Sequence, residues 1–187
     1  TPTRVVWGES ETVVEPFSTA LTLRSDAVAI GDLSMALPAG GLTVSGDVRF
    51  GALFALSLDY GLELDLATLP PWAPSVDGLN GALRVTGRID GPPADPTVSA
   101  RLESTAVGWG GLEFGDLDAA LRVGEGRLTV EALRATLAGG TLEGAGSVAP
   151  ADDGTSGAVR LSWANVNADR LSATVWPTRP APIASIV

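Results

Sequence analysis

The sequence predicts an all-β protein whose strands form an elongated, curved antiparallel sheet. The 23 glycines and 13 prolines among 187 residues interrupt the chain at short intervals, which favours short strands and tight turns over long helices. Apolar and polar residues alternate with a period of two, as in half-buried strands. A segment near the N-terminus also recurs about 100 residues later, which indicates a repeated β unit.

The clearest strand pattern runs from Leu79 to Ile89. Leu83 and Val85 fall on one face of this predicted strand, and Arg84 and Arg88 fall on the other. The same alternation recurs in residues 56–66, 98–102, 117–123, 128–130, 133–137 and 159–163. We therefore expect every strand to present one aliphatic face.

Turn signals separate these runs and predict hairpin connections between neighbours. They lie at residues 39–41, 77–78, 90–93, 124–126 and 138–140. The pattern gives roughly twelve strands, and at ~4.8 Å per strand an open sheet of that size would extend ~55 Å. A sheet this wide is expected to curl or fold over.

The internal repeat places residues 17–48 over residues 117–148 without a gap. The identical pairs are Ala20/Ala120, Leu21/Leu121, Leu33/Leu133, Leu37/Leu137, Gly40/Gly140, Leu42/Leu142, Gly46/Gly146 and Val48/Val148. The match continues with a slip of three residues, so that Leu58 falls over Leu161. Because apolar positions and turn glycines recur together, true repetition is favoured over chance.

The repeat divides the chain into four parts. Residues 1–16 are an irregular lead-in, residues 17–78 a first repeat ending in a Pro/Trp connector, residues 79–176 a second repeat, and residues 177–187 a Pro-rich tail. The chain does not begin with Met and ends in proline-rich sequence, so we expect it to be part of a longer protein. No apolar run approaches the roughly 20 residues of a membrane-spanning helix.

Composition disfavours several function classes. The formal net charge is −10 and the chain has no lysine, which argues against binding to nucleic acid or to anionic membrane surfaces by charge. Without His or Cys the chain lacks the usual general bases, nucleophile partners and zinc ligands. The glycine-rich stretches lack the spacing of phosphate-binding loops. We expect no enzyme activity, no cofactor and no metal site.

The remaining polar and aromatic candidates have simple structural interpretations. The carboxylate pairs Glu113/Asp116 and Asp152/Asp153 adjoin glycine and are interpreted as solvated turns. The five tryptophans, Trp7, Trp72, Trp109, Trp163 and Trp176, are dispersed along the chain, which favours core or edge positions over a sugar-binding platform.

The aliphatic face is the main candidate site, and two interpretations of it are open. It could be the core of a β-sandwich, or it could hold a featureless hydrocarbon, for which a strip of Leu and Val is suited. An acyl chain gains ~0.8 kcal/mol per buried methylene, or about 12 kcal/mol for 16 carbons. The predicted groove-lining residues are Leu58, Leu62, Leu64, Leu83, Val85, Ile89, Val98, Leu102, Leu121, Val123, Leu128, Val130, Leu137, Leu142, Val159 and Leu161.

Residues 78–148 resemble the TamB and AsmA-like proteins of diderm bacterial envelopes. The matching sequence pattern consists of Leu83-x-Val85-x-Gly87-x-Ile89, a turn through Asp95-Pro96, a strand at residues 98–102, and the repeated ending at residues 133–148. The segments LELDLATLPPW and LSWANVNADRL are similar to the connectors between such units. The resemblance spans most of residues 17–176.

The resemblance implies a fold, a location and partners. The fold would be a β-taco, a U-shaped sheet with an aliphatic groove, in a periplasmic part of a protein anchored in the inner membrane. Its ligand would be phospholipid or another acyl-chain lipid, moved toward the outer membrane, or it would assist outer-membrane protein assembly with a barrel partner bound through regions outside this chain. Two alternatives remain: a structural or adhesin-like repeat with a closed core, and a chaperone that holds unfolded strands along the sheet edge.

Overall fold

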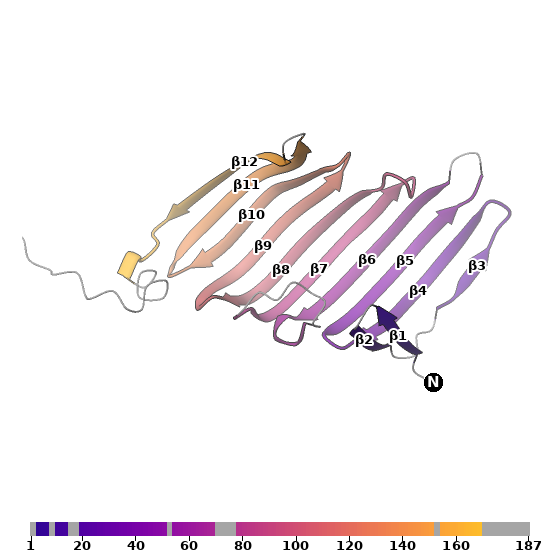
Figure 1. The fold of residues 1–187 in the computed structure, drawn as a ribbon, viewed down its shortest axis with the longest axis horizontal. Helices are drawn as coiled ribbons and strands as arrows, with labels where there is room; N and C mark the ends of the chain where they lie inside the picture. The colour runs from indigo at the N-terminus through magenta and orange to yellow at the C-terminus, as the bar shows by residue number, and fades with distance from the viewer. Residues whose placement is uncertain are drawn as a thin grey trace, which may run out of the picture.

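The computed structural model shows an all-β chain (Figure 1). It describes residues 3–7, 10–14, 19–51, 54–69, 78–151 and 154–169. A two-stranded hairpin, β1 (Thr3–Trp7) and β2 (Ser10–Val14), precedes a sheet of ten strands. The predicted all-β class is confirmed.

The ten strands of the large sheet follow one another in chain order, each antiparallel to the next. They are β3 (Leu21–Leu23), β4 (Ala27–Leu37), β5 (Gly40–Arg49), β6 (Ala55–Asp65), β7 (Asn80–Gly91), β8 (Thr97–Trp109), β9 (Leu112–Gly124), β10 (Arg127–Leu137), β11 (Gly140–Ala151) and β12 (Gly154–Ala164). A short 3₁₀ turn, η1 (Leu66–Thr68), follows β6. The Asp65 carboxylate caps it by accepting a hydrogen bond from the Ala67 backbone N–H. The predicted antiparallel hairpin connectivity is therefore confirmed.

The lead-in is not irregular as expected, because residues 3–14 contain the β1–β2 hairpin. Two valine pairs, Val5-Val6 and Val13-Val14, supply the β-branched residues that favour extended backbone. The Pro/Trp connectors at residues 70–74 and 175–177, the tail and the pair Asp152/Asp153 lie outside the described residues.

Three of the hairpin turns use two residues with positive φ, the geometry that matches the twist of the flanking strands. Gly110 and Gly111 join β8 to β9, and Glu125 precedes Gly126 between β9 and β10. At the β10–β11 turn Ala138 has φ 49° and Gly139 has φ 83°. Glycine takes this conformation without cost, whereas Ala138 does so with steric strain.

The large sheet is open and forms a single layer (Figure 1). Only five apolar residues are buried among those described, namely Ala27, Ala39, Leu66, Ala119 and Ala135. None of the described large side chains is fully buried. Because two of the twelve strands form a separate hairpin, the sheet holds ten strands, a width that an open sheet can still reach. The described residues thus contain no sandwich core.

Two strand pairs in the sheet have the same register 100 residues apart. In β4–β5, Ile30 faces Gly46 and Leu37 faces Gly40, with a register shift between Ile30 and Leu33. In β10–β11, the residues 100 positions later face each other in the same way, with a shift between Val130 and Leu133.

The correspondence extends to the next strand with a different offset from the one predicted. Gly46 faces Leu58 on β6, and Gly146 faces Val159 on β12. By register, therefore, Leu58 corresponds to Val159, an offset of 101 residues, and not to Leu161.

Candidate functional site

The candidate site is one continuous face of the sheet, which we call the apolar face. Cross-strand pairing connects its side chains into rows that run across the strands. One row crosses from β4 to β12 through Met35, Leu42, Leu62, Val85, Leu102, Ala119, Leu133, Gly144 and Leu161. A second crosses from β3 to β12 through Leu21, Ile30, Gly46, Leu58, Ile89, Val98, Val123, Leu128, Val148 and Gly157.

The register brings every predicted groove-lining residue onto this face. Apart from those in the two rows above, they are Leu64 and Leu83 on β6 and β7, Leu121 and Val130 on β9 and β10, Leu137 and Leu142 on β10 and β11, and Val159 on β12. The predicted separation of aliphatic from charged side chains is therefore present. That these residues line a groove is a proposal, taken up below.

Irregularities in pairing keep the face apolar where the sequence alternation fails. β8 shifts against β7 between Arg84 and Gly81, and β9 shifts against β10 near Asp116, which has φ 46°. The shifts return Val107 and Phe114 to the apolar face, where they face each other. The alternation of apolar and polar residues did not predict Val107 and Phe114 for the apolar face, because a bulge changes the face on which the following residues lie. The sequence signal for this bulge was the Gly115-Asp116 pair, since Asp116 has a left-handed backbone conformation in the structure.

Most apolar-face side chains on the inner strands are half-buried, although Val123 on β9 and Leu128 on β10 are exposed, and those on the edge strands β3 and β12 are exposed. On β7 the burial alternates, with half-buried residues at Leu83 and Val85 and exposed ones at Arg84 and Thr86. Neighbouring aliphatic side chains in the same layer produce this partial burial, since no second layer covers β7 in the described part of the chain. On the edge strand β12, Val159 is 65% exposed, Leu161 50% and Trp163 71%.

Tyr60 is a polar group set within the apolar face. Its ring lies over Gly87, where an added Cβ would be only 2.6 Å from the Tyr60 hydroxyl oxygen and 2.7 Å from Cζ. The hydroxyl donates a hydrogen bond to the Ser99 carbonyl on β8, at 3.2 Å. Burial raises the pKa of the Tyr60 hydroxyl above its ordinary value of 10.0, because the apolar surroundings disfavour the phenolate.

The opposite face is charged and is called the polar face. One register row across it consists of Glu63, Arg84, Glu103, Asp118, Arg134 and Glu143. Ion pairs join Arg84 to Glu63 and Arg134 to Glu143 within this row. Two rows away on the same face, the hydrogen bond to Asp90 and the charge of Asp59 raise the pKa of Arg88 further above its ordinary value. This face is built for contact with water.

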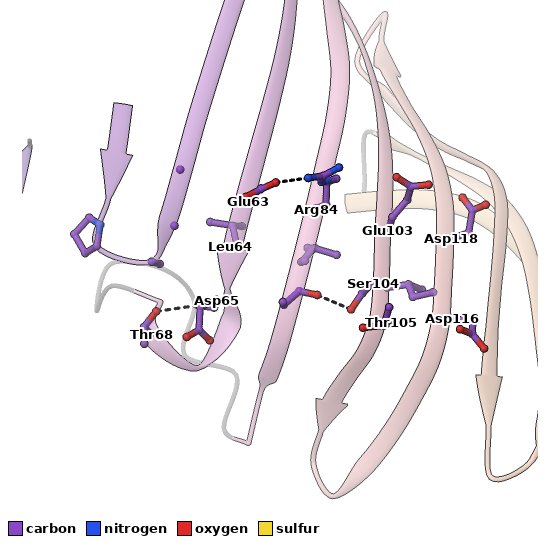
Figure 2. Close-up of a pocket in the computed structure, with 17 residues that line it drawn as sticks. Glu63, Leu64, Asp65, Thr68, Arg84, Glu103, Ser104, Thr105, Asp116 and Asp118 are labelled. Carbon is purple, nitrogen blue, oxygen red and sulfur yellow. Dashed lines mark hydrogen bonds and ion pairs between the residues drawn. The ribbon is translucent and has the colours of Figure 1, made fainter. Parts of the chain in front are cut away.

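A cavity of about 770 Å³ lies at the ends of β5 to β9 (Figure 2). Its lining includes Glu63 and Arg84 of the polar face, and also Leu64 and Leu83, which belong to the apolar face by register. Carboxylates dominate its polar lining: Glu63, Asp65, Glu103, Asp116 and Asp118. Arg84 pairs with Glu63 inside it, and the Ser104 hydroxyl donates to the Ala82 carbonyl. Nowhere in the described part of the chain do three or more of these carboxylates come together in a group that could hold a metal ion.

Glu113 and Asp116, interpreted above as turn carboxylates, are both exposed on β9. Asp116 lies at the β9 bulge and lines the cavity at the ends of β5 to β9. The two residues lie three positions apart on a strand, so their side chains do not form a matched carboxylate pair on a regular face.

Comparison with known proteins gave no match to any family model, curated protein or solved structure. Within the described ranges, no helix is both long and apolar enough to cross a membrane.

Proposed function

We propose that the apolar face binds and shields the acyl chains of phospholipid or a similar lipid. In this proposal the chain is a periplasmic segment of a TamB-like protein, and the ten-stranded sheet is part of a β-taco that carries lipid between the inner and outer membranes or assists outer-membrane protein assembly. The observation that carries it is the set of apolar rows that cross the sheet without a covering layer.

The energetics of the apolar face support a hydrocarbon ligand. Each methylene removed from water contributes ~0.8 kcal/mol, so even half of a 16-carbon chain would gain roughly 6 kcal/mol on this face. Most of the side chains available are aliphatic and offer no polar group to orient a headgroup. The Tyr60 hydroxyl, which lies among them, is already bonded to the Ser99 carbonyl. A surface of this kind suits chain length better than headgroup identity.

The shared register of β4–β5 and β10–β11 supports the proposal that the sheet is made of two ~100-residue repeats. Both copies contain the bulge after Ile30 or Val130, and both place aliphatic residues on the same face. Repetition extends the apolar face along the sheet while its width stays fixed by strand length. A lipid-carrying surface requires this kind of continuity.

The rival structural-repeat function requires a cover for the apolar face. No second layer occurs in the described part, and the exposed Val159, Leu161 and Trp163 continue the face to the last strand. A monomer whose apolar face proves inaccessible to any acyl probe would favour this rival.

The test compares matched double variants on the two faces of the same two strands. Val85→Asp with Leu102→Asp places two charges on the apolar face, at positions that face each other across β7 and β8. Thr86→Asp with Ser99→Asp adds the same charges on the polar face. Native mass spectrometry of the purified proteins, with lipid extraction and titration of a fluorescent fatty acid, measures lipid retention.

We expect copurified phospholipid and probe uptake in the unmodified chain and in the polar-face variant. The apolar-face variant should lose both while its far-ultraviolet circular dichroism still reports β-structure. Equal retention by the two double variants would contradict the proposal, as would an unmodified chain that is lipid-free and takes up no probe.

A further inference from the structure

In the described part of the chain, β12 is the last strand of the sheet and forms a long edge. It pairs with β11 through residues 154–164 without a register shift, and no described strand pairs with its other side. All of its side chains are exposed. It contains no proline and no lysine, the features that commonly protect an edge from further pairing. The opposite edge strand, β3, has only three residues.

The register shows which strand β12 resembles. Gly46 faces Leu58 on β6, and Gly146 faces Val159 on β12, so β12 occupies the place of β6 in the second copy. In the first copy the outer side of β6 is covered by β7, with Leu58 opposite Ile89 and Leu62 opposite Val85. The β6–β7 pairing is thus a template for a strand on β12.

One charge differs between the two positions. On the polar face of β6, Asp59 lies opposite Arg88 of β7 and forms an ion pair with it. The corresponding residue of β12 is Arg160, which is exposed and has no ion pair within the described residues. A strand that fits β12 as β7 fits β6 would therefore need an acidic residue opposite Arg160.

We propose that the free edge of β12 binds an antiparallel β-strand of β7 type, with aliphatic residues on its apolar side and a carboxylate opposite Arg160. Its backbone would pair with the outward amides and carbonyls of β12. Its aliphatic residues would lie opposite Val159 and Trp163, as Ile89 and Val85 lie opposite Leu58 and Leu62. The partner is a polypeptide, and the proposal does not depend on acyl-chain binding.

The test uses labelled 12-residue peptides and the whole chain. The first peptide has the sequence of residues 80–91, NGALRVTGRIDG, and the second differs by Arg88→Glu. Fluorescence anisotropy measures binding of each to the unmodified chain. We expect the Arg88→Glu peptide to bind about three- to thirtyfold more tightly, because its carboxylate faces Arg160 whereas the natural peptide places Arg against Arg. A third peptide, N-methylated at alternate residues, should fail to bind if backbone pairing holds it.

A charge reversal on the protein completes the test. Arg160→Asp should invert the preference, so that the natural peptide binds more tightly than the Arg88→Glu peptide. Arg122→Asp makes the same charge change on β9, within the sheet, and should leave the preference as it is in the unmodified chain. Retained preference in Arg160→Asp, inversion in Arg122→Asp, or equal binding of the N-methylated peptide would overturn the proposal.

Lipid binding is scored separately in the same preparations. Peptide binding with no lipid uptake would support the β12 site and reject the acyl-chain function, and the reverse result would do the opposite. Because Arg160 and the peptide charge lie on the polar face, the two outcomes are distinguishable.

Discussion

Glu103 and Asp118 lie directly opposite each other on β8 and β9, two carboxylates at one register position. Arg101, two residues before Glu103 on the same face of β8, forms ion pairs with both, at 3.3 Å to Glu103 and 2.6 Å to Asp118. Like charges placed directly opposite destabilise a sheet, and a shared guanidinium compensates for this. Arg101 therefore links the two carboxylates, which lie between Arg84 and Arg134 in their register row.

Arg101→Gln should lower the free energy of unfolding by about 1 kcal/mol, since it exposes this carboxylate repulsion. The loss should shrink in 1 M NaCl, where charges are screened within ~3 Å. Adding Glu103→Gln to Arg101→Gln should restore about half of it. Urea unfolding at low and high salt provides the measurement, and Arg122→Gln on β9 is the control. A salt-independent loss would show that packing of the Arg101 side chain causes the effect.

Tyr60 should couple the stability of the sheet to alkaline pH. Its folded-state pKa is raised above 10.0 by burial, so the unfolded chain releases the phenolic proton first as pH rises. The contribution is fully present below pH 10 and is lost as pH rises through the folded pKa. Tyr60 is the single tyrosine in the chain, so absorbance at 295 nm reports its ionisation alone.

We expect the absorbance midpoint of Tyr60 to lie above 10 in the folded protein and to fall toward 10 in denaturant. Tyr60→Phe should lower stability at neutral pH by about 1 kcal/mol through loss of the Ser99 hydrogen bond, and should remove this part of the alkaline decline. A midpoint at or below 10 in the folded state would refute the assignment of Tyr60 to an apolar environment.

The left-handed Ala138 is a site of avoidable strain. Its φ of 49° costs an L-residue roughly 1 kcal/mol that glycine does not incur. Ala138→Gly should therefore raise the free energy of unfolding by about 0.5–1 kcal/mol. Ala132→Gly within β10 is the matched control and should lower it by a similar amount. Thermal unfolding of both variants measures the change in stability. A change in the same direction for Ala138→Gly and Ala132→Gly would contradict the assignment of strain to Ala138.

Much of the sheet could be predicted because most of its strand segments follow a period of two between the bulges. β7 shows this most clearly, since Leu83 and Val85 alternate with Arg84 and Thr86 and the structure separates them onto two faces. Glycine-bearing turns marked the hairpins, and their order along the chain is the order in the sheet. Local pattern and global topology agree here, because neighbouring strands in sequence are neighbours in space.

The rest depended on information between strands. The charged row through Glu103 and Asp118 arises from register, which the shifts near Asp116 and between Val130 and Leu133 adjust. A pattern along one strand cannot show those shifts, so Val107 and Phe114 escaped the prediction. The β1–β2 hairpin was missed because residues 3–14 lack the clear alternation of the later strands, since Val5-Val6 and Val13-Val14 are adjacent apolar pairs.

Two tryptophans on the apolar face permit a direct test of where acyl chains bind. Trp109 is 52% exposed and Trp163 is 71% exposed, at the ends of β8 and β12. Lipids brominated on the acyl chain should quench both, because bromine quenches indole only at short range. Trp163→Phe and Trp109→Phe should each reduce the quenched part of the emission, and the double substitution should reduce it further.

The control uses the same lipid without bromine, which should leave emission intensity nearly constant. The variant Val85→Asp with Leu102→Asp, whose charges lie in the middle of the apolar face, should keep its tryptophans but lose the quenching. If quenching is unchanged when both Trp109 and Trp163 are replaced, the lipid lies elsewhere on the chain. Quenching that depends on both tryptophans and on an uncharged Val85–Leu102 pair would place the acyl chains along the apolar rows.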